Sequence, residues 1–76
     1  MCRTVSFKVS SGMDSAARVL TTLRRKNFLV KEFTMKEIDS SKTRLIVTLE
    51  DEKNPGFDRA VLQMKKLVDV YDIKEI

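Results

Sequence analysis

The N-terminal residues alternate between apolar and polar side chains. Val5, Phe7 and Val9 are separated by a serine and a lysine, and a period of two is typical of a strand with one buried face. The polar segment Ser10–Gly12 ends this alternation. We therefore expect a first strand that ends at this segment.

The next apolar residues recur at helical spacing. Ser11 and Asp14 have the spacing of a capping box, in which two side chains satisfy backbone amides at the start of a helix. The cationic run 24–26 suits the last turn of a helix, where the carbonyl groups are exposed. Asn27 tolerates the left-handed conformation that often ends helices. The apolar face of the predicted helix carries Ala16, Leu20 and Leu23, flanked by Ala17 and Val19.

Two pairs of apolar residues after this helix fall on opposite faces of an extended chain. Phe28 and Val30 share one parity, whereas Phe33 and Met35 share the other. A regular strand cannot bury all four on one face, because successive side chains point to opposite sides. Either residues 28–30 form a connector, or a β-bulge lies near residues 31–32.

A third strand is predicted after a polar turn over Ile38–Lys42. Leu45, Val47 and Leu49 occupy alternate positions there, which again indicates one buried face. The charged segment 50–53 that follows is expected to be a loop.

A second helix is predicted after this loop. Asn54 and Pro55 suit the cap and the first position of a helix, so we interpret Asn54-Pro55-Gly56 as a structural feature and not as a ligand-binding turn. Asp69 breaks the helical pattern, and residues 70–73 indicate a last short strand. The apolar residues of this helix are Phe57, Ala60, Val61, Met64 and Leu67.

The predicted order is strand, helix, strand, strand, helix, strand. This order is typical of the α+β ferredoxin-like arrangement, βαββαβ. Right-handed crossovers place both helices on one face of a four-stranded antiparallel sheet. Residues 1–76 are thus expected to form a single domain. The opposite sheet face and the two strand edges require polar side chains or a partner.

Composition argues against an enzyme. The 76 residues contain no histidine and one cysteine, Cys2, so the commonest general base, an internal disulfide and a multi-cysteine metal site are all excluded. No set of nucleophile, base and stabiliser can be assembled. No apolar stretch is long enough for a signal peptide or a membrane span, so we expect a cytoplasmic protein without a membrane partner.

The net charge of +4 raises the question of whether the chain binds nucleic acid. Lysines and arginines are mixed with acids along most of the chain, which favours an ordinary solvated surface. RNA-recognition domains of the same fold carry stacking aromatics on their two central strands. The third strand has none, and Phe7 of the first strand shares the parity of the core. We therefore expect no nucleic acid, and we interpret Met13, Met35 and Met64 as packing residues.

Two stretches resemble the small regulatory subunit of acetolactate synthase, whose fold is an ACT domain. The run Lys65-Lys66-Leu67-Val68-Asp69-Val70-Tyr71-Asp72-Ile73 is similar to a Lys-Leu-Val-Asp-Val run that joins the second helix to the last strand in that family. The segment from Arg18 to Met35 resembles the passage from the first helix to the second strand. This similarity covers nearly the whole chain. In length, the chain resembles the short type of small subunit, which is found in isozyme II.

The resemblance implies a non-catalytic accessory role in branched-chain amino acid biosynthesis. In that family the catalytic subunit carries thiamine diphosphate, magnesium and flavin, and it forms acetolactate from pyruvate. The small subunit raises this activity and in many members makes it sensitive to valine. The implied partner is therefore the catalytic subunit, and no cofactor is expected in this chain.

The resemblance also indicates an effector site formed by the turn before the first helix and the start of the second strand. Its residues here are Ser11, Gly12, Met13, Asp14, Leu29 and Met35. Valine-sensitive members have Asn at the positions of Ser11 and Leu29, and Gly at the position of Asp14. Asp14 brings a negative charge to the place of a ligand carboxylate, and Leu29 offers no hydrogen bond. The site is expected to be degenerate and insensitive to valine.

A homodimer is expected through the unpaired edge of the second strand, Phe33–Glu37. Two other functions stay open at this point. One is a stand-alone amino-acid-sensing ACT module with a different partner, and the other is a small RNA-binding domain.

Overall fold

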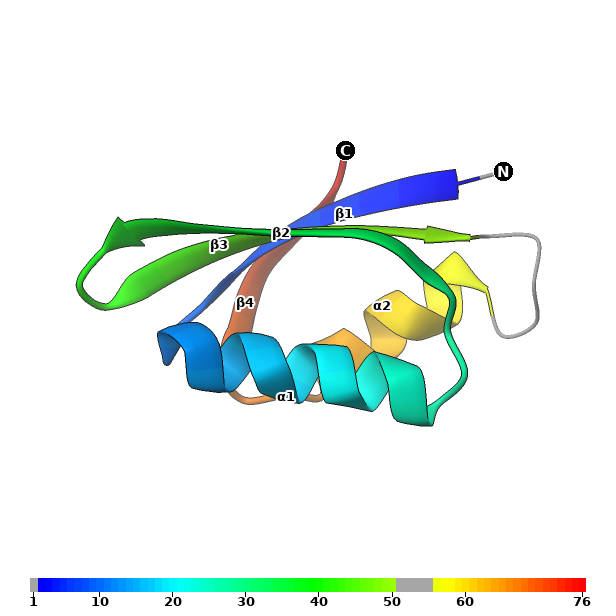
Figure 1. Cartoon of the computed structure of the whole chain (residues 1–76), viewed down its shortest axis with the longest axis horizontal. Coiled ribbons are helices and arrows are strands. Elements are labelled where there is room, and N and C mark those ends of the chain that lie inside the picture. The colour runs from blue at the N-terminus through cyan, green and yellow to red at the C-terminus, as the bar shows by residue number, and fades with distance from the viewer. Residues whose placement is uncertain (1, 51–55) are drawn as a thin grey trace.

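The computed structural model describes residues 2–50 and 56–76. The sheet order is β2-β3-β1-β4, with antiparallel pairing between all neighbours. Figure 1 shows α1 and α2 on the same side of this sheet, which confirms the predicted α+β ferredoxin-like fold. The elements are β1 (Cys2–Val9), α1 (Gly12–Arg25), β2 (Val30–Asp39), β3 (Lys42–Glu50), α2 (Phe57–Lys65) and β4 (Val70–Glu75).

The core lies between the sheet and the helices. β1 and β3 alternate as predicted and bury one face completely, and their core residues are Val5, Phe7, Val9, Leu45, Val47 and Leu49. The helices cover them with Val19, Leu23, Phe57, Ala60 and Met64. Burying each large apolar side chain contributes about 1.5–3 kcal/mol to folding. Leu20, expected in the core, is only half-buried, because it lies at the margin of α1 beside the sheet edge.

α1 ends at Arg25, and Asn27, which was predicted to stop the helix, adopts the left-handed conformation just beyond it, with φ of 66°. The Asn27 amide donates to the Arg24 carbonyl (3.1 Å), and the Phe28 amide donates to the Leu23 carbonyl (3.0 Å). This pair of bonds is a Schellman motif. Phe28 and Leu23 are both buried, so the motif also turns the chain toward β2 with its apolar residue inside.

A β-bulge in β2 resolves the conflicting parities of residues 28–35. Val30 pairs with Leu49, but Glu32 pairs with Thr48, so the extra residue is Lys31. Phe28 precedes the strand as a buried connector residue. Of the two alternatives, the bulge near residues 31–32 is confirmed, whereas the connector is shorter than residues 28–30 because Val30 already belongs to β2. The following turn is tighter than predicted, because only residues 40 and 41 lie between β2 and β3.

The start of α2 differs from the prediction. The helix begins at Phe57 and its N-cap residue is Gly56, whose backbone is extended, with φ of −99°. Starting here places the Phe57 side chain, 1% exposed, in the core. Asn54 and Pro55, which were expected to form the cap, lie outside the described residues.

The segment between α2 and β4 also departs from the pattern. The helix already ends at Lys65, so Asp69 lies in the turn before β4 rather than at a helix end. β4 continues to Glu75, beyond the predicted residue 73. Its register against β1 shifts opposite residues 6–8, and Asp72 has φ of 59° at this bulge.

Candidate functional site

The turn between β1 and α1 is held together differently from the predicted capping box. Ser11 is the N-cap residue, but its side chain makes no capping hydrogen bond. Its amide donates instead to the Ser15 hydroxyl at 3.1 Å, and the Asp14 amide donates to the Ser11 carbonyl at 3.2 Å. Ser15 is fully buried under the turn and takes the bond that Asp14 was expected to accept. The capping-box prediction is wrong, and the Asp14 side chain is exposed in the first helical turn.

Asp69 anchors this turn from the other end of the chain. Its Oδ2 atom accepts a hydrogen bond from the Ser15 hydroxyl at 2.9 Å and forms an ion pair with Arg18. Its carbonyl accepts a bond from the Ser10 amide at 3.2 Å. The start of α1 and the segment before β4 are therefore fixed to one another. Sequence reasoning missed this pairing, although a polar Ser15 beside the apolar positions of the helix was a signal of it.

Gly12 occupies a backbone conformation that favours glycine. Its φ is +53° at the first position of α1, a region in which L-residues are strained. An added Cβ would lie 3.9 Å from the Thr43 hydroxyl, which is an ordinary contact. The backbone angle, and not lack of space, is therefore what requires glycine in this turn.

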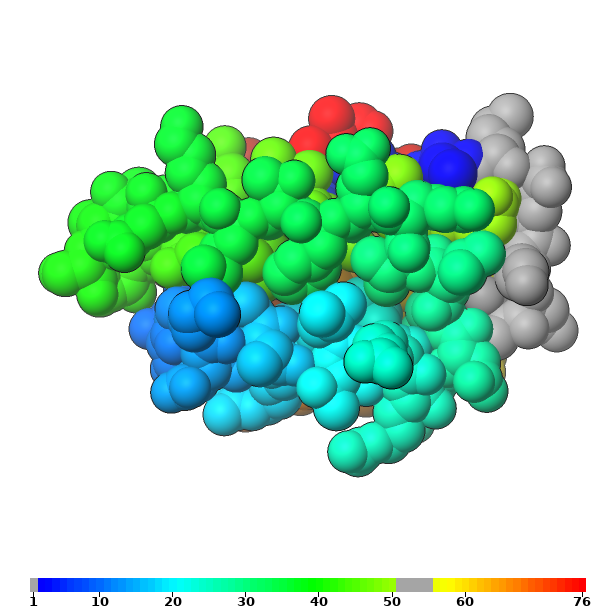
Figure 2. Space-filling view, in the orientation of Figure 1, coloured from blue at the N-terminus to red at the C-terminus, as the bar shows by residue number. Residues whose placement is uncertain are grey.

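An apolar groove runs between α1 and the edge strand β2, which lie side by side in Figure 2. Its volume is about 350 Å³, and it is lined by Met13, Ala16, Ala17, Leu20, Phe33 and Met35. Met13 is 68% exposed and Met35 is 40% exposed. The prediction that these two residues pack in the core is therefore wrong for the single chain. The cause is that β2 ends the sheet, and within residues 2–50 and 56–76 no further strand pairs with its outer edge. Met64, in contrast, is fully buried as predicted.

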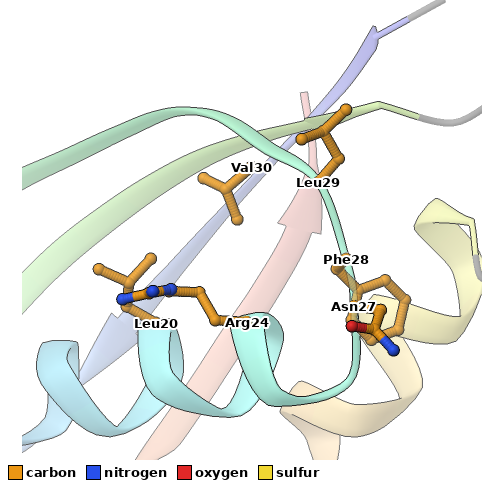
Figure 3. A pocket seen from close by; sticks show the side chains of 6 residues that line it. All are labelled: Leu20, Arg24, Asn27, Phe28, Leu29 and Val30. Atoms are coloured by element: carbon orange, nitrogen blue, oxygen red, sulfur yellow. The ribbon is translucent and has the colours of Figure 1, made fainter.

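A second, larger hollow of about 640 Å³ lies at the other end of α1 (Figure 3). Leu20 lines both hollows, so they follow each other along α1. Arg24 supplies a positive charge here and its side chain extends toward Leu20, whereas Leu29 contributes an apolar side chain from the segment before β2 (Figure 3). The lining residues are Leu20, Arg24, Asn27, Phe28, Leu29 and Val30.

The six predicted effector residues are therefore divided among three places. Met13 and Met35 meet in the apolar groove, whereas Leu29 lies in the hollow beside Arg24. Ser11, Gly12 and Asp14 form the turn and line neither. A single chain thus offers an apolar surface next to a helix start and does not assemble the polar groups into one pocket.

The described residues offer little for catalysis or metal binding. Among residues 2–50 and 56–76, no three His, Cys, Asp or Glu side chains are grouped so that they could hold a metal ion. Cys2 is exposed as a free thiol. Phe7 is fully buried, so it cannot stack on a nucleic-acid base. No helix in the described ranges is long and apolar enough to cross a membrane.

Comparison with known families identifies the family to which this fold belongs. The ACT domain profile matches residues 13–73, from the start of α1 into β4. This range is most of the chain, and the protein therefore belongs to the ACT domain family. A search of the curated proteins finds no significant sequence match.

Solved structures of two kinds are similar to the chain. The crystal structure of the ACT domain from the GTP pyrophosphokinase of Chlorobium tepidum has a TM-score of 0.80 at 4% identity, and the match covers 100% of this chain and 97% of that one. The acetolactate synthase small subunit from Thermotoga maritima has a TM-score of 0.73 at 20% identity. That match covers 99% of this chain but only 47% of the small subunit. At these identities the likeness shows the fold alone.

Proposed function

We propose that the chain is a non-catalytic regulatory subunit that binds the catalytic subunit of acetolactate synthase and raises its activity. The observation that carries this proposal is the run from Lys65 to Ile73, which resembles the family's passage from the second helix to the last strand. A regulatory role is consistent with membership of the ACT family. The small subunit from Thermotoga maritima has the same fold, as has the ACT domain of the GTP pyrophosphokinase, so the fold is compatible with this assignment without selecting it.

The contacts of Asp69 indicate a structural role for the run from Lys65 to Ile73. Asp69 stands in the middle of the run and anchors the start of α1 through Ser15 and Arg18. The segment that carries the resemblance is therefore also the one that shapes the β1–α1 turn. This link supports reading the run as part of the regulatory architecture.

The working form that we propose is a homodimer formed through β2. In the described part of the chain the outer edge of β2 has no partner strand, and two such edges can pair about a two-fold axis. The partner's α1 and β2 would then cover Met13 and Met35, whose exposure is costly in water. Dimerisation would also bring two β1–α1 turns close to the two apolar grooves.

The effector response that we propose is weak or absent for valine. The exposed Asp14 carboxylate lies in the first turn of α1, where an amino-acid carboxylate would be held by the helix start. Like charges at about 4 Å repel by roughly 1–4 kcal/mol. The groove itself is apolar and offers no polar side chain to a ligand.

The alternative is a stand-alone amino-acid-sensing module with another partner. The apolar groove between α1 and β2 is the observation that favours it, because such a groove accepts an aliphatic side chain. The two proposals differ in what the chain does to acetolactate synthase. Only the first requires a change in that enzyme's turnover.

The deciding experiment is an activity titration. The cognate catalytic subunit, supplied with thiamine diphosphate, magnesium and flavin, is assayed for acetolactate formation while the chain is added up to saturation. We expect turnover to rise and then level off at a fixed stoichiometry. No change in acetolactate production at saturating chain would reject the proposed subunit role.

A further inference from the structure

The sheet face opposite the helices carries a line of three cations across adjacent strands. Lys36 of β2 is directly opposite Arg44 of β3, and Arg44 is directly opposite Lys8 of β1. Leu45 and Phe7, the next residues along their strands, are buried under the helices. The alternation of a strand therefore places Arg44 and Lys8 on the open face. We refer to Lys36, Arg44 and Lys8 as the basic row.

This arrangement is unfavourable for the isolated chain. Directly opposed residues of antiparallel strands have Cβ atoms about 4.5–5.5 Å apart, and like charges at such positions destabilise a sheet. Lys8 is relieved by an ion pair with Asp72 at 3.0 Å. Among the residues that the structure describes, Lys36 and Arg44 form no ion pair. Both are exposed, so the positive charge is presented to solvent.

A fourth cation lies next to the row. Lys74 of β4 is opposite Ser6 on the same face of β1. The hydrogen bond and charge of Lys8 lower the pKa of Asp72, and the charges of Lys74 and Arg44 lower this pKa further. One carboxylate thus stands among at least three cations, which leaves this end of the open face with an excess of positive charge.

The rest of the open face suits a protein surface better than a nucleic acid. Thr4 and Thr48 share a hydrogen bond of 2.9 Å across β1 and β3, and Ile46 lies half-buried between them and the basic row. No aromatic residue of β1 or β3 points to this side, so the central strands have nothing on which bases could stack. A small apolar and hydroxyl centre beside charged groups is typical of protein interfaces.

We propose that the basic row is a docking site for an acidic surface of the protein partner. This inference rests on the proposed function, under which the partner is the acetolactate synthase catalytic subunit. Carboxylates of that subunit would face Lys36 and Arg44 and remove the repulsion that the free chain retains. Under this proposal, the repulsion among the basic row lowers the stability of the free chain, and the same charges strengthen binding to the partner.

The test uses Arg44→Glu, which has opposite expected effects on binding and on stability. Glutamate at this position would lie between Lys36 and Lys8 and turn two repulsions into attractions. These outweigh the lost attraction between Arg44 and Asp72, which is the weakest of the contributions to the Asp72 pKa, so the melting temperature should rise by about 1–5 °C. Its affinity for the acidic partner surface should fall by at least about tenfold. Binding of the full chain to the purified catalytic subunit is measured by calorimetry at low and at moderate salt.

The matched control is Arg59→Glu. Arg59 is also exposed, and it lies in the first turn of α2, on the other side of the molecule, where a negative charge suits the helix dipole. The two variants change the net charge equally. We expect Arg59→Glu to bind like the unmodified chain and Arg44→Glu to bind weakly, with most of the difference lost as salt is raised.

The other outcomes are each decisive. Equal binding of both variants, with the unmodified chain binding well, would overturn the docking site and leave the proposed function intact. Failure of the unmodified chain to bind the catalytic subunit would overturn both. Binding of a mixed-sequence single-stranded RNA that is lost in Arg44→Glu, without binding to the subunit, would show that the row serves a nucleic acid instead.

Discussion

The Ser15 hydroxyl donates a 2.9 Å hydrogen bond to Asp69 Oδ2, although the two residues are 54 positions apart. Ser15 is fully buried, and its oxygen also accepts a hydrogen bond from the Ser11 amide. One hydroxyl thus joins the start of α1 to the turn before β4. The position of the β1–α1 turn, and with it the rim of the apolar groove, depends on this bond.

Ser15→Ala should destabilise the protein by about 1–2 kcal/mol, because it leaves the Ser11 amide without its acceptor and removes one of the two side-chain donors to Asp69, the other being Arg18. Urea unfolding at fixed protein concentration measures this change. Ser40→Ala, in the exposed turn between β2 and β3, is the control and should change the free energy of unfolding by less than about 0.5 kcal/mol. Equal effects of the two variants would show that the Ser15 bond contributes nothing to stability.

Met35→Lys should convert the proposed dimer to a monomer. Met35 lies on β2 beside the groove, and a charge there would be buried when two β2 edges pair. Light scattering across micromolar concentrations measures the molar mass. Leu62→Lys, on an exposed position of α2, is the control and should leave the dimer unchanged. A stable monomer of the unmodified chain at these concentrations would contradict the dimer itself.

Valine should bind the unmodified chain with a dissociation constant in the millimolar range or weaker, because Asp14 repels its carboxylate and Leu29 cannot donate a hydrogen bond. The triple change Ser11→Asn, Asp14→Gly and Leu29→Asn should improve affinity by at least about tenfold. Calorimetry measures both constants. Isoleucine and leucine serve as comparison ligands, and a low-micromolar constant for valine with the unmodified chain would show that the site is not degenerate.

Acid should weaken the fold partly through Asp72. Lys8 lowers the pKa of this carboxyl below its ordinary value of 3.8, so the pair adds stability above that value, and the stability is lost as pH falls through the lowered folded pKa. The unmodified chain should therefore lose more stability below about pH 4 than Asp72→Asn does. Thermal unfolding at stepwise lower pH measures this difference.

Asp39 supplies an internal comparison for the same measurement. The Ser41 amide donates to its carboxylate at 2.8 Å, and this bond lowers the pKa of Asp39 in the exposed turn. Asp72→Asn should therefore keep part of the acid sensitivity, and Asp39→Asn should remove the other part. Identical pH profiles of Asp72→Asn and the unmodified chain would show that the Lys8 ion pair does not act on stability.

Local patterns in the sequence predicted most of the fold. The period of two in β1 and β3 identifies their buried faces, because burial on one side requires that alternation. The parity conflict between Phe28 and Phe33 indicated an irregularity, and one of its two predicted explanations, a bulge near residues 31–32, is the one found at Lys31. Asn27 ended α1 as expected, since its left-handed conformation is a local property.

The site could not be predicted in the same way. Ser15 and Asp69 meet only after the whole chain has folded, so a polar Ser15 beside the apolar positions of α1 could signal a buried partner but could not identify Asp69, 54 positions away. Met13 has the apolar character of a core residue, but its 68% exposure depends on which strand ends the sheet. The capping box failed for a local reason, because the Ser15 hydroxyl in the next turn of the helix accepts the hydrogen bond of the Ser11 amide.

The two outer strands of the sheet are unequal, and this inequality limits how many copies can join. β2 has a regular stretch from Glu32 to Glu37, whereas β4 has only six residues and is interrupted at Asp72. A short, bulged edge is a poor template for another strand. Once two β2 edges have paired, only the β4 edges face outward at both ends. In the proposed dimer, growth is therefore expected to stop at two copies, without an open-ended filament.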